Sequence, residues 1–208
     1  MDTSSALPLG PESLHNDVQT MSRRAVEMLT LVRDAFRRQD CAPLERADRL
    51  GQEIHRLEKA LIAHAENVSA DVLAVPMHLE RVGDNIELLV RAVRVMVAES
   101  VPFSERAIRE VETLFARALE LLECVRDVLI TGNRVLVRYV VEHGRGFENL
   151  TDDFARVHEQ RLIEGVCMPR ASSLYLAMLD DLKGVESHTR QIASGLVRSG
   201  ERDARPAA

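Results

Sequence analysis

The segment DVQTMSRRAVEMLTLVRDAFRRQD, residues 17–40, decides the fold because the chain repeats it as EVETLFARALELLECVRDVLITGN at residues 110–133. Nine of the 24 aligned pairs are identical, and several others exchange one apolar residue for another. The repeat spacing of 93 residues exceeds the unit of about 20–50 residues that is typical of solenoid proteins. The pattern therefore indicates a duplicated supersecondary block within one fold.

Apolar residues recur every three or four positions in both blocks, which is the pattern of amphipathic helices. Proline and serine residues mark the expected helix starts. The stripes predict three helices per block. In the first block these are residues 12–39, a second helix opened by Pro43 and a third from Ser69 to Glu99. In the second block they are a fourth helix capped by Ser104, a fifth over residues 134–164, and a sixth opened by Pro169 and Ser172 and ending near Arg198.

The fifth helix contains Gly144 and Gly146, each of which costs about 1 kcal/mol relative to alanine inside a helix. The three-and-four spacing of apolar residues nevertheless keeps one phase across both glycines, so we predict a continuous helix that could bend there. The expected fold is all-α: two tandem three-helix antiparallel bundles, residues 1–100 and 101–198, followed by a disordered tail at residues 199–208.

Composition excludes several classes of function. The net charge of −6 argues against nucleic-acid binding, which requires clustered lysine and arginine residues. Three scattered cysteines without metal-site spacing are typical of reduced thiols in a cytosolic protein. The sequence has neither a signal-peptide pattern nor an apolar run of about 18 residues. We therefore expect a cytoplasmic protein that reaches a membrane only through a partner, and whether it forms a homodimer is left open.

The candidate site is the segment MHLERVGDN, residues 77–85, in which Glu80 and Asp84 share one face of the third helix. Two carboxylates at this spacing repel each other unless a cation lies between them, so they could form a hard-metal site. A solvated charged face is the alternative interpretation. The antiparallel register brings Glu53 of the second helix to about the same level, with Asp48 and His55 about one turn away.

The second block differs at the corresponding level, where Lys183 lies beside Glu148, Asp152 and Asp153 in the expected register. A lysine beside acidic residues predicts ion pairs rather than a cation site. A single Glu-x-x-His spacing, Glu12 with His15, is too little for a di-iron carboxylate enzyme, which needs two such motifs. The two blocks are therefore expected to differ in chemistry.

The segment HLERVGDNIELLVRAV, residues 78–93, resembles the signature of the PhoU family of phosphate-uptake regulators. The segment SSLYLAMLDDLKGVESHTRQIA, residues 172–193, is similar to the sixth helix of the PhoU-like domains of sodium/phosphate cotransporters, in which lysine and serine replace the two acids. The resemblance covers residues 14–198 and implies the six-helix architecture. Lys183 and Ser187 depart from the acidic motif, which puts a second metal cluster in doubt.

The resemblance implies a non-enzymatic regulator of phosphate transport and signalling, acting beside a phosphate transporter subunit or a sensor kinase. It also implies binding of iron, zinc or another divalent cation at Glu80 and Asp84, with Asp48, Glu53 or His55 as neighbouring ligands. Two rival functions stay open: a metal-free helical adaptor and a carboxylate-bridged di-metal enzyme. The sequence leaves the partner and the metal unspecified.

Overall fold

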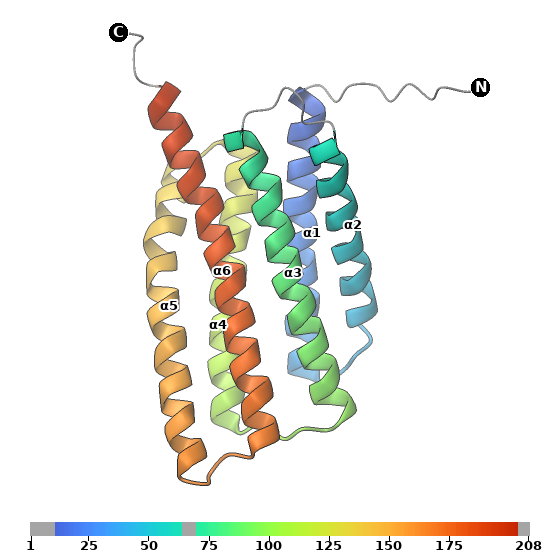
Figure 1. The fold of residues 1–208 in the computed structure, drawn as a ribbon, viewed down its shortest axis with the longest axis vertical. Helices are drawn as coiled ribbons and strands as arrows, with labels where there is room; N and C mark the ends of the chain where they lie inside the picture. The colour runs from blue at the N-terminus through green and yellow to red at the C-terminus, as the bar shows by residue number, and fades with distance from the viewer. Residues whose placement is uncertain (1–10, 64–69, 204–208) are drawn as a thin grey trace, which may run out of the picture.

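The apolar stripes form six α-helices in the computed structural model, which describes residues 11–63 and 70–203 (Figure 1). No strand occurs in these ranges, so the predicted all-α class is confirmed. The helices are α1 (Pro11–Arg38), α2 (Leu44–Ala63), α3 (Ala70–Ala98), α4 (Glu105–Thr131), α5 (Arg134–Ile163) and α6 (Pro169–Asp203).

Side-chain caps and a left-handed glycine set the boundary between the fourth and fifth helices. The Ser104 hydroxyl accepts a hydrogen bond of 3.2 Å from the backbone N–H of Ala107 at the start of α4. Gly132 ends α4 with a φ of 65°, a conformation that favours glycine. The Asn133 side chain then caps α5, which runs without interruption through both of its internal glycines, as predicted.

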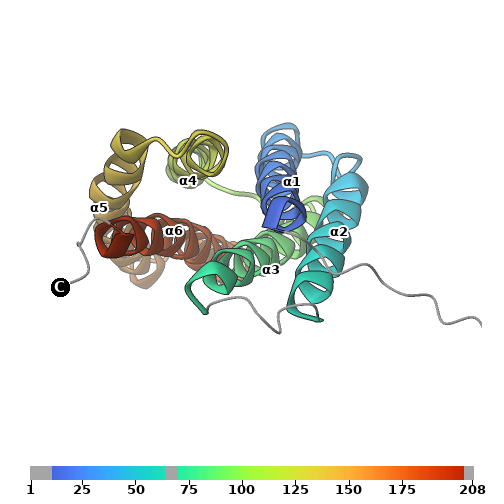
Figure 2. The ribbon, with the colours of Figure 1, turned by 90° about the horizontal axis from the view of Figure 1, so that it is seen from above.

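The two bundles lie side by side and meet through two pairs of helices. Figure 2 shows α3 beside α6 and α1 beside α4, with α2 and α5 on the outside. Within the described ranges, α2 and α5 contact only helices of their own bundle. Because α3 packs against α1, α2 and α6, part of its polar surface, including Glu80, Asp84 and Glu87, lies next to other helices, while Arg81 and Arg91 are exposed.

One hydrophobic core runs through both bundles. The ring of Phe36 on α1 lies 5.8 Å from that of Phe115 on α4, measured between centroids. Phe103, in the segment that joins the bundles, contacts both Phe36 and Tyr175 of α6. The predicted stripe of α3 is buried at its centre, where Leu79, Val82, Ile86, Val90 and Val93 are at most 1% exposed. The bundles therefore pack as one unit.

The end of α6 differs from the prediction, and some predicted helix ends lie outside the described residues. The helix α6 continues to Asp203, beyond the end near Arg198 that the apolar pattern predicts, because a polar segment can extend a helix that packing has already formed. Residues 199–203, which were expected to begin a disordered tail, thus belong to α6. The proposed cap Ser69, the turn near Asn67 and residues 204–208 of the predicted tail lie outside the described residues. None of the described helices combines the length and apolar content needed to cross a bilayer.

Candidate metal centre

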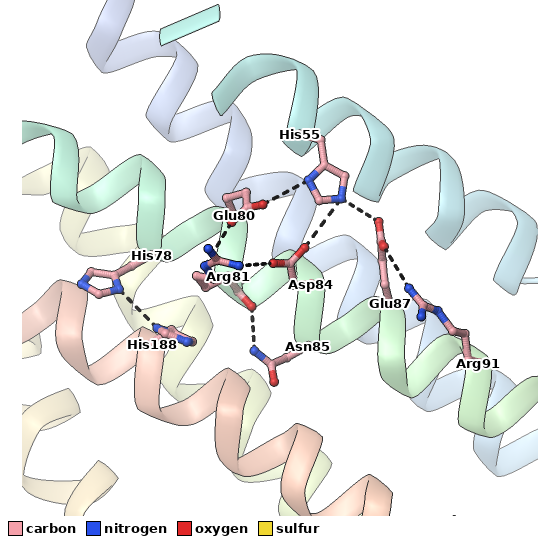
Figure 3. Close-up of polar contacts among 9 residues, drawn as sticks. All are labelled: His55, His78, Glu80, Arg81, Asp84, Asn85, Glu87, Arg91 and His188. Carbon is pink, nitrogen blue, oxygen red and sulfur yellow. Dashed lines mark hydrogen bonds and ion pairs between the residues drawn. The ribbon is translucent and has the colours of Figure 1, made fainter. Parts of the chain in front are cut away.

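The acidic stripe of α3 faces α2, and His55 of α2 lies against it (Figure 3). Glu80, Asp84 and Glu87 occupy successive turns of α3, which places their carboxylates on one side of that helix. All three side chains are half-buried, with 19%, 33% and 24% of their surface exposed. The stripe is therefore a contact between two helices, not a solvated face.

One group of side chains has the geometry to hold a cation. The ligand atoms of His55, Glu80 and Asp84 lie within 4.8 Å of one another. His55 Nδ1 is 3.4 Å from Glu80 Oε1, and His55 Nε2 is 3.8 Å from Asp84 Oδ1. An imidazole with two carboxylates is a donor set that suits iron, zinc or manganese. The residues present thus fit a divalent transition metal.

Arg81 organises the two carboxylates from the opposite side. Its Nη1 donates to Asp84 Oδ2 at 3.0 Å, and its Nε lies 3.6 Å from Glu80 Oε2. The other oxygen of each carboxylate is the one that faces His55. Arg81 therefore neutralises part of the charge and orients both carboxylates, as outer hydrogen-bond partners do in metal sites.

The charge balance favours a cation at Glu80. Burial raises the pKa of this carboxyl, and the neighbouring Asp84 raises it further. The charges of Arg81 and His55 act in the opposite direction but do not cancel the effect. A bound cation would stabilise the ionised carboxylate, so the site gains electrostatically from a metal.

Glu87 holds the imidazole in place. Its Oε1 lies 3.0 Å from His55 Nε2, and Arg91 lies 3.7 Å from its other oxygen. A Cβ at Gly51 would lie 2.5 Å from Glu87 Oε1, so the glycine makes room for this carboxylate against α2. Sequence reasoning did not assign Glu87 to the site, although it lies three residues after Asp84 on the same face.

Two predicted neighbours lie elsewhere. Asp48 forms an ion pair with Arg94 at 2.6 Å, and Glu53 forms one with Arg24 of α1 at 2.9 Å. The structure thus brings together Glu80, Asp84 and His55 and does not bring Asp48 or Glu53 to them. Glu53 lies two residues before His55 and projects from the opposite side of α2, whereas Asp48 projects from the same side as His55 but lies two helical turns away along the axis.

The second bundle carries ion pairs at the corresponding level. Lys183 Nζ lies 2.9 Å from Asp152 and 3.3 Å from Glu148, as predicted, whereas Asp153 pairs with Arg156 at 2.9 Å. Ser187 accepts a hydrogen bond from Gln191 on the same helix. No group of three or more histidine, cysteine or acidic residues in the described part of this bundle is close enough to share a cation. The two bundles therefore differ in chemistry.

A pair of histidines joins the two bundles. The Nδ1 atoms of His78 on α3 and His188 on α6 lie 3.2 Å apart (Figure 3). Sequence reasoning missed this pair because it sought histidines three or four residues apart on one helix, whereas these are separated by 110 residues. Only the docking of α3 against α6 brings them together.

Comparison with known proteins supports the architecture. No protein-family model matches the sequence, and no curated protein matches it. Among solved structures, the fold is similar to that of PhoU from Pseudomonas aeruginosa, with a TM-score of 0.81 and 16% sequence identity. The match covers 90% of this chain and 97% of that chain. At this identity the likeness shows the fold, which is PhoU-like over nearly its full length.

Proposed function

We propose that this chain is a PhoU-like regulator of phosphate transport and signalling that works as a metal-binding accessory protein. The observation that carries the proposal is the PhoU-like fold, which extends over 90% of the chain. The signature-like segment at residues 78–93 supports the same function independently, because it is the part of the sequence that resembles the PhoU family. The role is regulatory and non-enzymatic.

The proposed metal links α2 to α3. His55 of α2 and the two carboxylates of α3 would hold an iron, zinc or other divalent cation, and Glu87 and Arg81 would keep these ligands oriented. Loss of the metal would leave Glu80 and Asp84 to repel each other beside a half-buried histidine. Metal occupancy would thereby adjust the packing of α2, which lies on the outside of the molecule.

The proposed partner is a phosphate transporter subunit or a sensor kinase at the inner face of a membrane. The protein would be cytoplasmic and would reach the membrane through that partner. The likeness of the second repeat to the PhoU-like domains of sodium/phosphate cotransporters supports a transporter as the partner, with Lys183 and Ser187 in place of the acids.

Metal binding is tested by isothermal titration of chelator-treated protein with Mn²⁺ and with Zn²⁺. The Glu80→Gln/Asp84→Asn variant should bind Mn²⁺ at least tenfold more weakly than the wild type, because the carboxylates supply its oxygen ligands. Asp48→Asn is the matched control, since this acid lies on α2 but pairs with Arg94. Equal affinity in the double variant and the wild type would remove the metal from the proposal.

The regulatory role is tested by radioactive phosphate uptake in cells that lack this chain. Uptake should stay high when phosphate is abundant, and the wild-type chain should restore its repression. Failure of the deletion to alter uptake would reject the regulatory function. If the double variant binds no metal yet restores repression fully, the metal-free adaptor is the better description. Oxygen consumption or peroxide turnover by the loaded protein would instead favour the di-metal enzyme.

A further inference from the structure

The contact between His78 and His188 lies at the seam between the two bundles. His78 projects from α3 and His188 from α6, and both side chains are half-buried there. Their rings are tilted by 33° with centroids 5.4 Å apart. The pair is separate from the candidate metal centre, which joins α2 to α3 within the first bundle (Figure 3).

The separation of the two nitrogens matches the span of a chelated transition metal. A zinc ion holds imidazole nitrogens at about 2.0–2.1 Å in tetrahedral directions, so two such ligands lie about 3.3 Å apart. The Nδ1 atoms of this pair are 3.2 Å apart. A small rotation of the rings would therefore point both lone pairs at one ion without separating α3 from α6.

The charges around the pair are mixed. Burial lowers the pKa of His188, and the neighbouring His78 and Arg81 lower it further. Asp84 has the opposite effect. The three charged or titratable neighbours, His78, Arg81 and Asp84, all belong to α3, the helix that packs against α6 here. Burial and the nearby positive charges therefore favour the neutral imidazole, which is the form that binds metals.

We propose that His78 and His188 form a second metal site, one that joins the two bundles and binds zinc, nickel or copper through paired imidazoles. Water completes the coordination, because the protein supplies two ligands. Imidazole ligands favour these metals over magnesium and calcium, which prefer oxygen. The site would tie metal occupancy to the docking of α3 against α6. It goes beyond the proposed function, because it does not depend on phosphate regulation or on the carboxylate centre.

The decisive experiment is electron paramagnetic resonance of one equivalent of Cu²⁺ bound to the His55→Gln variant, which lacks the imidazole of the carboxylate centre. The spectrum should show hyperfine splitting from two nitrogen ligands. Adding either His78→Gln or His188→Gln should remove one nitrogen and weaken Cu²⁺ binding at least tenfold. His143→Gln is the matched control, because that histidine is exposed on α5 and bonds to the Tyr139 carbonyl.

A thermal measurement gives an independent readout. Zn²⁺ at about 100 times its Kd should raise the melting temperature of the His55→Gln protein by about 5–10 °C. The increase should vanish in His188→Gln and persist in His143→Gln, and melting without Zn²⁺ checks that each variant folds. Copper spectra that do not change in His78→Gln and His188→Gln, or a Zn²⁺ effect that survives both substitutions, would overturn the proposal.

Discussion

At the scale of single residues, Glu110 is one of two buried acids in the part of the chain that the structure describes. It is 6% exposed. Its carboxylate accepts hydrogen bonds from the Tyr175 hydroxyl at 2.7 Å, from Arg106 at 2.7 Å and from Arg161 at 3.2 Å. Burial alone would raise the pKa of this carboxyl, but the hydrogen bonds from Arg106 and Tyr175 and the charge of Arg161 lower it overall. The same contact raises the pKa of the Tyr175 hydroxyl, after burial as the main cause.

Replacing Glu110 by glutamine should destabilise the fold. The change leaves Arg161, whose side chain is 13% exposed, without its counter-charge. Breaking a buried pair in this way costs about 3 kcal/mol of unfolding free energy. Urea denaturation at pH 7 measures the loss. Glu123→Gln on the same helix is the control, because Glu123 is 51% exposed and its pair with Arg126 should contribute less than about 1 kcal/mol. Equal losses of unfolding free energy in the two variants would contradict a stabilising role of the buried Glu110–Arg161 pair.

The contribution of Glu110 should also depend on pH. Its pKa in the folded protein lies below the ordinary value of 4.5, so the unfolded chain takes up a proton first as the pH falls. The stabilisation is therefore complete above about pH 4.5 and is lost as the pH falls through the folded pKa. The stability difference between the wild type and Glu110→Gln should shrink between pH 7 and pH 3 in urea titrations. A constant difference over this range would show that the charge of Glu110 is not responsible.

At the scale of helices, α5 contains two glycines in opposite surroundings. Gly144 is buried against α6, where an added Cβ would lie 2.2 Å from Glu186 Oε1 and 2.8 Å from Arg190 Cδ. Glu186 is 1% exposed and is held by Arg190, so it has little room to move. A Cβ at Gly146 would meet nothing within 4 Å. Gly144 permits the close approach of α5 and α6, whereas Gly146 is not at a helix contact.

Alanine substitutions at these two positions should therefore have opposite effects. Gly146→Ala should raise the unfolding free energy by up to about 1 kcal/mol, because alanine is the better helix former. Gly144→Ala has the same propensity gain, but it should lower the unfolding free energy by about 1–2 kcal/mol, because Glu186 and Arg190 must be displaced. Chemical denaturation of the two variants measures the increase in unfolding free energy expected for Gly146→Ala and the decrease expected for Gly144→Ala. Stabilisation by Gly144→Ala would mean that α5 and α6 are not in close contact there.

At the scale of the whole molecule, the two bundles should unfold together. Arg33 on α1 pairs with Glu112 on α4 at 3.2 Å, and Phe36 packs on Phe115 beside them. The chain has no tryptophan, and its two tyrosines, Tyr139 and Tyr175, lie in the second bundle. Tyrosine fluorescence thus reports on one bundle, and helical circular dichroism reports on both.

Urea unfolding curves from these two probes should coincide, because separating the bundles would expose the apolar faces of α1, α3, α4 and α6 to water. A tyrosine transition at a clearly different urea concentration would show that the bundles unfold independently.

The sequence predicted the helices well because their evidence is local. The period of 3.6 residues places Leu79, Val82 and Ile86 on one face of α3, and it places Glu80 and Asp84 together on another face. The repeat of residues 17–40 predicted the two-bundle arrangement. The continuity of α5 across its glycines was predictable in the same way, because the apolar phase does not change there.

The sequence by itself determined the helices, their buried faces and the acidic pair on α3, because each depends on spacing along one helix. Only the tertiary structure decided that His55 rather than Glu53 meets that pair, and that His78 meets His188. These contacts depend on the rotation and sliding of one helix against another, which many side chains determine together. The spacing of residues along one helix does not determine how that helix rotates or slides against its neighbour.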